Sequence, residues 1–375
     1  MQKSIIQVNL RNKPENETLY SIGIIKFDNN VSGKEILLSL AAFQWSAAFS
    51  EPLIINLLLE HGAKVDEKIP VIEGTTLHLA TSYGKEENVK CLLDAGADYS
   101  QTDYYNTRAF HFATGYGHLE ILKIVYERGS HRYINQANGH SNAPIYIASI
   151  IGHGNVLKWL SQRGAKVNQP GINGATPLYL ASAHGHIGIF RELLNNGADT
   201  HKMNDMSYFP ILTASENAQL EIFEILHDSG AFVSDVGAQD NGTCYHRVVC
   251  CSHESLSDHN GIIALLAGEG LDINQMNNAD ISPLYLACIL QKLKHAQCLL
   301  KYGANINQMG PRGNVDVTAL VAVPAIIFGW KVNAISSFRP RNNIVSNSST
   351  PANAPKGVLS SVRRRGRKKY DIEAK

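Results

Sequence analysis

Residues 176–197, TPLYLASAHGHIGIFRELLNNG, decide the fold of this chain. Thr176 is placed to cap a helix, and Pro177 suits the first turn because its missing N–H costs nothing there. The pair Gly185 and His186 is expected to break this helix and to start a second one. The stretch therefore predicts two short helices joined by a tight turn.

The second helix has an apolar stripe and a defined end. Apolar residues at i, i+3, i+6 and i+7 would face a neighbouring helix pair, and these are Ile187, Phe190, Leu193 and Leu194. Gly197 stands where a helix end needs a residue that accepts positive φ. An extended segment and a turn follow, so each unit is a helix pair plus a projecting turn, which cannot bury its apolar face alone.

The same stretch recurs along the chain. Glycines at the position of Gly197 follow one another at 34, 33, 35, 33, 33, 40 and 33 residues, and they are Gly62, Gly96, Gly129, Gly164, Gly197, Gly230, Gly270 and Gly303. A TPLYLA-like phrase ends 16 residues before most of them, as TTLHLA, RAFHFA, APIYIA, TPLYLA, FPILTA and SPLYLA. A seventh phrase, TCYHRV, lies farther from its glycine, which predicts an insertion. So regular a period indicates a stack of units rather than separate domains.

The period and the phrase resemble the ankyrin repeat, from about residue 32 to about residue 310. The resemblance implies an all-α solenoid of about eight stacked helix-turn-helix units with projecting β-turns. The chain departs from the pattern at LLSLAAFQWSAAF in the first unit, at Arg108, at Phe209 and at Val248. We expect the sixth and seventh units to be the least stable, because solenoid stability is a sum of neighbour terms.

Four segments are expected. Residues 1–33 form an N-terminal extension or cap, and residues 34–310 form the solenoid, with the insertion near 252–260. Residues 311–335 form an apolar capping half-repeat, for which a membrane-dipping segment at 317–330 is the alternative. Residues 336–375 are rich in Ser, Asn and Pro and should be a disordered basic tail.

The net charge of +1 hides two opposite regions. Residues 336–375 contain 10 Lys+Arg and 2 Asp+Glu, which leaves 24 against 31 in residues 1–335. The hydrophobic share of 44% excludes wholesale disorder. No apolar run is long enough to cross a bilayer, and the N-terminus lacks a secretory-signal pattern. Six cysteines without a CxxC pair suit a reducing compartment.

A basic cluster stands in the tail. It consists of Arg363, Arg364, Arg365, Arg367, Lys368 and Lys369. Such runs are typical of nuclear localisation signals and of polyanion-binding patches. A nuclear import receptor, a nucleic acid and an anionic membrane are therefore candidate partners, and a solvated tail without a receptor is the alternative.

No catalytic motif is present, so we expect no enzyme, no cofactor and no bound metal. His78, His111 and His246 recur at one position of the repeat, and the ankyrin resemblance implies that they hydrogen-bond between neighbouring turns. A zinc site is the alternative for one cluster rich in cysteine and histidine, which consists of Cys244, His246, Cys250, Cys251, His253 and His259.

The resemblance implies a protein partner bound by the turn tips and by the concave face of the first helices. The register assigns eleven residues to these places: Tyr83, Tyr104, Tyr105, Tyr116, His140, Ile150, Ile151, Ile172, His184, Asp205 and Met206. The aromatic and aliphatic members concentrate in units two to four and indicate an interface centre. The alternative is that these tyrosines and isoleucines pack within the stack.

These patterns favour a non-enzymatic protein–protein interaction module or scaffold, acting as a monomer in the cytoplasm or nucleus. A host-directed effector of an intracellular bacterium is the first alternative, favoured by the Asn-rich composition, the small repeat-only architecture and the short polar tail. Binding of nucleic acid or an anionic membrane by the tail is the second alternative. An enzyme ranks last, because residues 1–33 and 311–375 are too short for a catalytic core.

Overall fold

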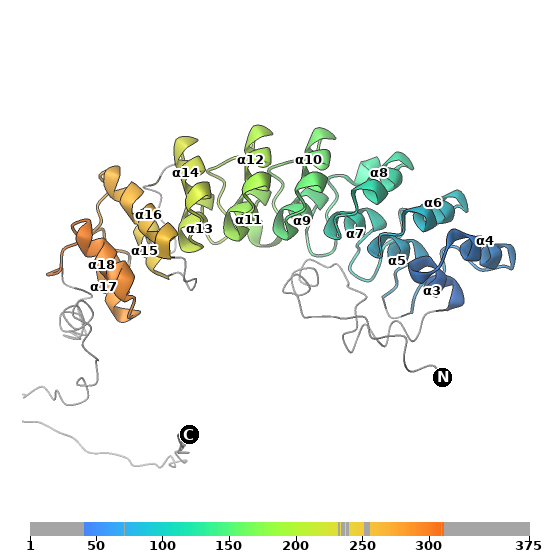
Figure 1. Ribbon diagram of the computed structural model, residues 1–375, viewed down its shortest axis with the longest axis horizontal. Helices are drawn as coiled ribbons and strands as arrows, with labels where there is room; N and C mark the ends of the chain where they lie inside the picture. Colours follow the sequence, from blue (N-terminus) through green and yellow to red (C-terminus); the bar gives the residue numbers. More distant parts are fainter. Residues whose placement is uncertain are drawn as a thin grey trace, which may run out of the picture. The chain divides into compact units, whose positions relative to one another are not determined.

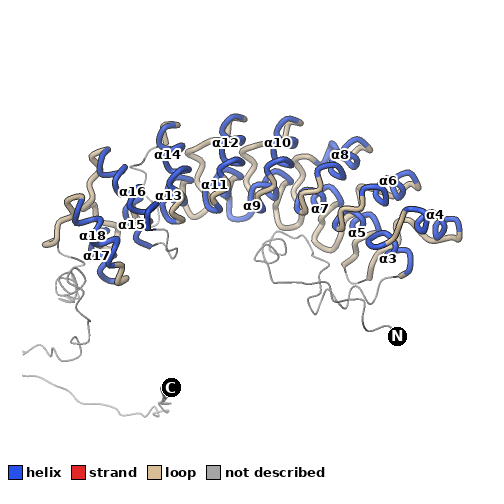
Figure 2. The backbone as a smooth tube through the Cα atoms, viewed as in Figure 1, coloured by secondary structure: helices blue, strands red, loops and turns tan. Residues whose placement is uncertain are grey.

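The computed structural model describes residues 41–70, 72–231, 233, 237, 240–250, 256–308 and 310. These residues form sixteen α-helices in eight consecutive pairs, and none of them lies in a β-strand (Figure 2). The first helices are α3 Ala42–Phe49, α5 Thr76–Ser82, α7 Ala109–Gly115, α9 Pro144–Ile151, α11 Pro177–His184, α13 Pro210–Glu216, α15 Cys244–Cys250 and α17 Pro283–Ile289. The second helices are α4 Pro52–Glu60, α6 Glu86–Asp94, α8 Leu119–Glu127, α10 Gly154–Gln162, α12 Ile187–Asn195, α14 Leu220–Asp228, α16 Leu256–Gly268 and α18 Leu293–Lys301.

The eight pairs stack in sequence order. Each first helix packs against the first helices of the units before and after it, and most second helices do the same. Figure 1 shows the two sets of helices as two layers of this stack. The predicted all-α solenoid of helix-turn-helix units is confirmed.

The helix ends form as the sequence predicts. The Thr176 hydroxyl accepts a hydrogen bond from the Tyr179 N–H at 3.1 Å, and Ser282 caps α17 in the same way. Gly185 ends α11 with φ of +70°. Gly197 follows α12 with φ of +81°, a conformation that side chains with a Cβ rarely adopt.

The histidines of the TPLYLA-like phrase link neighbouring units, as predicted. In α5, the Nδ1 atom of His78 accepts from the Thr75 N–H at 3.0 Å. The Nε2 atom of His78 donates to the carbonyl of Thr107, in the next unit, at 3.2 Å. His111 and His246 make the equivalent bonds to the carbonyls of Gln136 and Ile281. Each bond fixes the turn of one unit to the helix of the one before.

The first unit has the same architecture although its sequence lacks the phrase. Gln44 stands in α3 at the position of His78, and its Oε1 atom accepts from the Ala41 N–H at 3.0 Å. The side chain of Gln44 is 3% exposed. A glutamine therefore closes the first turn of this helix in the way that histidine does elsewhere.

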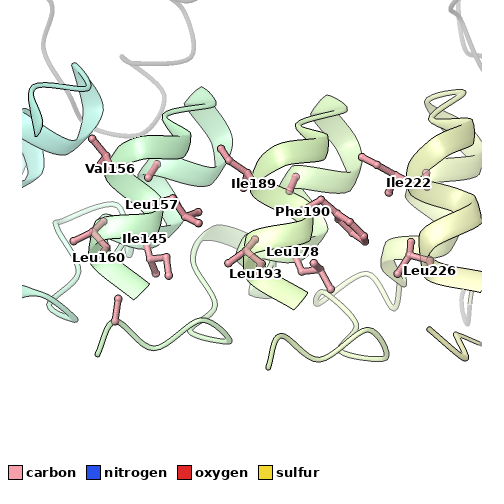
Figure 3. Packing of buried hydrophobic residues seen from close by; sticks show 14 of the residues in the cluster. Ile145, Val156, Leu157, Leu160, Leu178, Ile189, Phe190, Leu193, Ile222 and Leu226 are labelled. Carbon is pink, nitrogen blue, oxygen red and sulfur yellow. The ribbon is translucent and has the colours of Figure 1, made fainter. Parts of the chain in front are cut away.

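The core runs through the stack between the two layers of helices. Ile189, Phe190 and Leu193 of α12 are buried in it, and Figure 3 shows them beside the equivalent residues of α10 and α14. Ile187 and Leu194 are partly buried against the same cluster. The apolar stripe of the second helix thus packs between units, as predicted.

The projecting turns are joined by backbone hydrogen bonds. The N–H groups of Tyr104, Gly139, Asp205 and Asn278 donate to carbonyls of the preceding turn at 2.7–2.9 Å. Most turns also place one residue other than glycine at positive φ, for example Glu73 at 52° and Asn106 at 54°. The turn tips are therefore ordered by their neighbours as well as by their own sequence.

The seventh unit, in which the insertion is expected, differs from the others in the length of its second helix. Here α16 has 13 residues, whereas the other second helices have 9. Residues 252–255 of the predicted insertion, and Cys251 just before it, lie outside the described residues. So do the N-terminal extension, the apolar segment 311–335 and the basic tail. Within the described part of the chain, no helix is long and apolar enough to cross a membrane.

Candidate protein-binding surface

Three side-chain positions of each first helix, equivalent to Leu79, Ser82 and Tyr83, are here called the first-helix face. The positions equivalent to Leu79 are mostly buried, and those equivalent to Tyr83 keep an accessible part. In the first five units none of these positions carries an acidic, lysine or arginine side chain. The residues are Trp45, Ala48, Phe49, Leu79, Ser82, Tyr83, Phe112, Gly115, Tyr116, Ile147, Ile150, Ile151, Leu180, Ala183 and His184. Depletion of charge is typical of the centre of a protein interface.

Aromatic side chains begin this face. The rings of Trp45 and Phe49 lie 4.4 Å apart, and Phe49 meets Tyr83 of the next unit edge-on at 4.8 Å. Trp45 is 37% exposed and Phe49 is 43% exposed. Sequence reasoning missed both residues, because the first unit could not be aligned to the phrase until Gln44 was recognised as the counterpart of His78.

Four of the assigned residues continue the face across units two to four. Tyr83, Tyr116, Ile150 and Ile151 are partly buried and pack on a small apolar cluster, whose buried members are Ile69, Ile72, Leu79, Phe112 and Ile147. The side chains thus pack within the stack and still keep an accessible part. Together with Trp45 and Phe49 we call them the apolar band.

The turn tips carry a second aromatic row. Tyr104 is 70% exposed and meets the Tyr105 ring edge-on at 5.3 Å. Tyr105 in turn lies 5.0 Å from the ring of His140 in the next turn. Ile172, in the short 3-10 helix Ile172–Gly174, is half-buried.

The face changes character from the fifth unit onward. His184 is exposed and stacks on His186 at 5.8 Å. Asp205 and Met206 are exposed at the following turn tip, and the half-buried Glu216 is the first acidic side chain on the first-helix face. Charged and polar side chains thus enter the face in units five and six, whereas in the eighth unit the equivalent positions are again apolar, with Ile289 52% and Leu290 42% exposed.

An ion pair occupies the seventh unit at a position where six of the other seven units have an apolar side chain. Arg247 stands at the position of Leu79, is 5% exposed and donates to Asp240 Oδ1 at 2.5 Å. Its guanidinium lies 4.5 Å from the centre of the Tyr208 ring. The charge of Arg247 is therefore paired with a carboxylate of its own unit.

A second row of histidines supports the backbone beneath the face. The Nε2 atoms of His118, His153 and His186 lie 3.0–3.4 Å from carbonyls of the preceding unit, namely those of Ser82, Gly115 and Ile150. The Gly-His pair was interpreted from the sequence only as a helix break. Its histidine also holds the end of the preceding first helix, where the apolar band lies.

Desolvation disfavours the charged form of several histidines in the stack. Burial lowers the pKa of His78 and of His111 to about 4. Burial also lowers the pKa of His118 and of His184, the latter with a contribution from His186. Among them, only His184 belongs to the first-helix face of units one to five, and its lowered pKa favours the neutral form there near pH 7.

Only part of the cluster considered as the alternative zinc site lies in the described residues. No group of three or more potential ligands lies together there, and His246 makes the hydrogen bonds of its repeat position. Cys251 and His253 lie outside the described residues, as do all six residues of the basic cluster, Arg363 to Lys369.

The geometry defines a class first: a repeat solenoid that offers one extended, largely uncharged face and a row of turn tips. The sequence pattern of "Ankyrin repeats (3 copies)" matches residues 38–138 and 145–240, which is more than half of the chain. The chain therefore belongs to the ankyrin repeat family. Members of this family generally mediate protein–protein interactions and are typically not enzymes.

Three curated relatives illustrate how widely this repeat is used. The chain is 30% identical over 137 residues to phosphocholine transferase AnkX of Legionella pneumophila, covering 36% of this chain and 14% of that protein. It is 35% identical over 107 residues to mouse palmitoyltransferase ZDHHC13, covering 28% and 17%. It is 35% identical over 95 residues to the rat nuclear factor NF-kappa-B p105 subunit, covering 25% and 10%. The matched region spans less than a fifth of each relative.

Proposed function

We propose that the chain is a protein-binding module whose partner docks on the apolar band and the adjacent turn tips. The observation that carries the proposal is the absence of charged side chains from the first-helix face over five successive units. Partly exposed aromatic rings add large contact area at a small entropic cost. The polar residues that follow, such as Asp205 and Glu216, would form the rim.

Binders selected against the full chain from a random peptide library test this proposal. We expect most selected peptides to lose at least tenfold in affinity for the double variant Tyr116→Ser, Ile151→Ser. The matched control is Lys123→Ser, in α8 on the second-helix side of the same unit, which should leave the affinity unchanged. Equal affinities for the double variant and the wild type, with both folded by circular dichroism, would refute the proposed site.

A second proposal concerns where the module acts. We infer a host-directed bacterial effector from the Asn-rich composition and from the similarity to a Legionella pneumophila protein over 36% of this chain. The basic cluster Arg363 to Lys369 would then direct the protein to a nucleus. A translocation reporter fused to the full chain and to a chain without residues 336–375 tests both roles. Unchanged delivery and unchanged location after the deletion would exclude both roles of the tail.

A further inference from the structure

The outer side of the first described unit is unusually apolar. On α4, Leu53 is 79% exposed, Ile54 is 44% exposed and Leu57 is 52% exposed. We call these three side chains the end face. Isolated apolar residues are common on protein surfaces, but three on adjacent turns of one helix form a contiguous patch.

The repeat register identifies what the position of Ile54 normally contacts. Its seven equivalents are all at most 5% exposed, and they are Asn88, Ile121, Val156, Ile189, Ile222, Ile262 and His295. Asn88 donates hydrogen bonds to the carbonyls of Ala47 and Ser50, which belong to the preceding unit. This position therefore faces the preceding unit wherever one is described.

The position of Leu57 has the same orientation. Its equivalent Cys91 lies 2.8 Å from the Asn56 side chain of the preceding unit. Its equivalent Trp159 packs edge-on against Tyr126 of the preceding unit, with the ring centres 4.9 Å apart. Leu57 thus has the apolar side chain of an inter-unit contact but no described unit to contact.

Leu53 differs from its equivalents in the other units, because none of them is a large apolar residue. In the other units this position, which points away from the core, holds Glu87, Glu120, Asn155, Gly188, Glu221, Gly261 and Lys294. Leucine replaces a polar residue or glycine only in the unit that has no described predecessor. The surface to be covered at this end is therefore larger than an ordinary contact between two repeats.

We propose that residues 1–40 of the same chain cover the end face. These residues are joined directly to Ala41, at the unit that carries the patch, so the contact is intramolecular and has a high effective concentration. The segment is longer than the 33-residue period and contains three apolar stretches, IIQVNL, IGIIKF and EILLSL. Burial of Leu53 and Leu57 against it would contribute on the order of a few tens of cal/mol per Å² of apolar surface.

Covering of the end face by residues 1–40 would also affect the proposed binding site. The proposal for the end face does not depend on partner binding. Trp45 and Phe49, at the start of the apolar band, belong to the same unit as the end face. Covering the end face would stabilise the unit that carries them, because terminal units of a solenoid have only one neighbour.

A photo-crosslinking amino acid at position 53 of the full chain tests the proposal. We expect crosslinks from position 53 to peptides of residues 1–40 within the same molecule. The matched control is position 203, where Met203 is 45% exposed in a distant unit, and it should give no such crosslinks. A mixture of isotope-labelled and unlabelled chains separates contacts within one chain from contacts between two. Crosslinks between two copies, or none to residues 1–40, would overturn the proposal.

A pair of substitutions with matched exposure gives a second readout. Leu57 and Ile289 are both 52% exposed in the described residues. Leu57→Asp should increase the amide exchange of residues 1–40 at least tenfold and lower Tm, whereas Ile289→Asp should leave that exchange unchanged. Equal effects of the two substitutions on residues 1–40 would contradict the proposal, and the crosslinking result stands even if Leu57→Asp fails to fold. Neither readout depends on the apolar band, so failure here and failure of the proposed function are distinguishable.

Discussion

Acid should destabilise the stack through the buried histidines of the TPLYLA-like phrase. His78 and His111 are buried, and burial lowers the pKa of each to about 4, from an ordinary value of 6.5. Between these two pH values the unfolded chain binds more protons than the folded chain. The free energy of unfolding is therefore highest above pH 6.5 and falls as the pH decreases toward 4. Linkage gives a loss of about 2 kcal/mol per histidine at pH 5 relative to pH 8.

Gln44 indicates the substitution that isolates this effect. Its amide oxygen replaces the histidine Nδ1 as acceptor for the first turn and does not titrate. We predict that the double variant His78→Gln, His111→Gln is less stable than the wild type at pH 8, because the bonds from Nε2 to Thr107 and Gln136 are weakened or lost. As the pH decreases to 5, the free energy of unfolding of the variant should improve relative to that of the wild type by about 4 kcal/mol, because the variant lacks the two titrating histidines.

Urea unfolding followed by circular dichroism between pH 5 and pH 8 measures this difference. His295, whose pKa burial also lowers to about 4, is present in both proteins and cancels. A solenoid can unfold in sections, so amide exchange of residues 76–127 provides a local readout of the same units. Parallel pH profiles for the two proteins would refute the assignment of neutral, buried histidines as the acid-sensitive groups.

Three further predictions follow from particular residues. Asp240→Ala should lower stability by about 2 kcal/mol, because it leaves the buried Arg247 without its carboxylate; Arg247→Leu restores the side chain of the equivalent Leu79 and should cost less, so a larger loss for Arg247→Leu in thermal unfolding would contradict this view. Glu73→Gly should raise stability by about 0.5–1 kcal/mol, because Glu73 has φ of 52°, whereas Asn106→Gly should change it less, as asparagine tolerates this region; equal effects in chemical denaturation would count against the turn argument. Ile222→Ala, at a fully buried contact between the sixth unit and the fifth, should cost about 2–5 kcal/mol; a Tm unchanged within error would place this side chain outside the core.

The repeat made most of the fold predictable from the sequence. The spacing of the glycines located the eight units, and the capping by Thr176 and the bonds of His78 and His246 followed from the phrase itself. The first unit was harder, because Gln44 resembles histidine only in offering an acceptor at one position of the first turn. Such an equivalence becomes visible when the bond to the Ala41 N–H is seen.

For the candidate binding surface, the register predicted which helix positions lie on one face but not how their side chains pack. The register placed Tyr83 and Tyr116 on the first-helix face, yet the sequence could not determine how far they sink into the cluster around Phe112. The bonds of His118, His153 and His186 join residues 36–38 positions apart. They depend on how one unit is set against the next, which the period alone does not specify.

The central claim is that partners bind across the apolar band. Its most direct test is a photo-crosslinking amino acid at position 116 of the full chain, compared with one at position 123 on the second-helix side of the same unit, each in complex with a selected peptide binder. We predict abundant crosslinks from position 116 and few from position 123. Crosslinks mainly from position 123, or equally from both, would contradict the account.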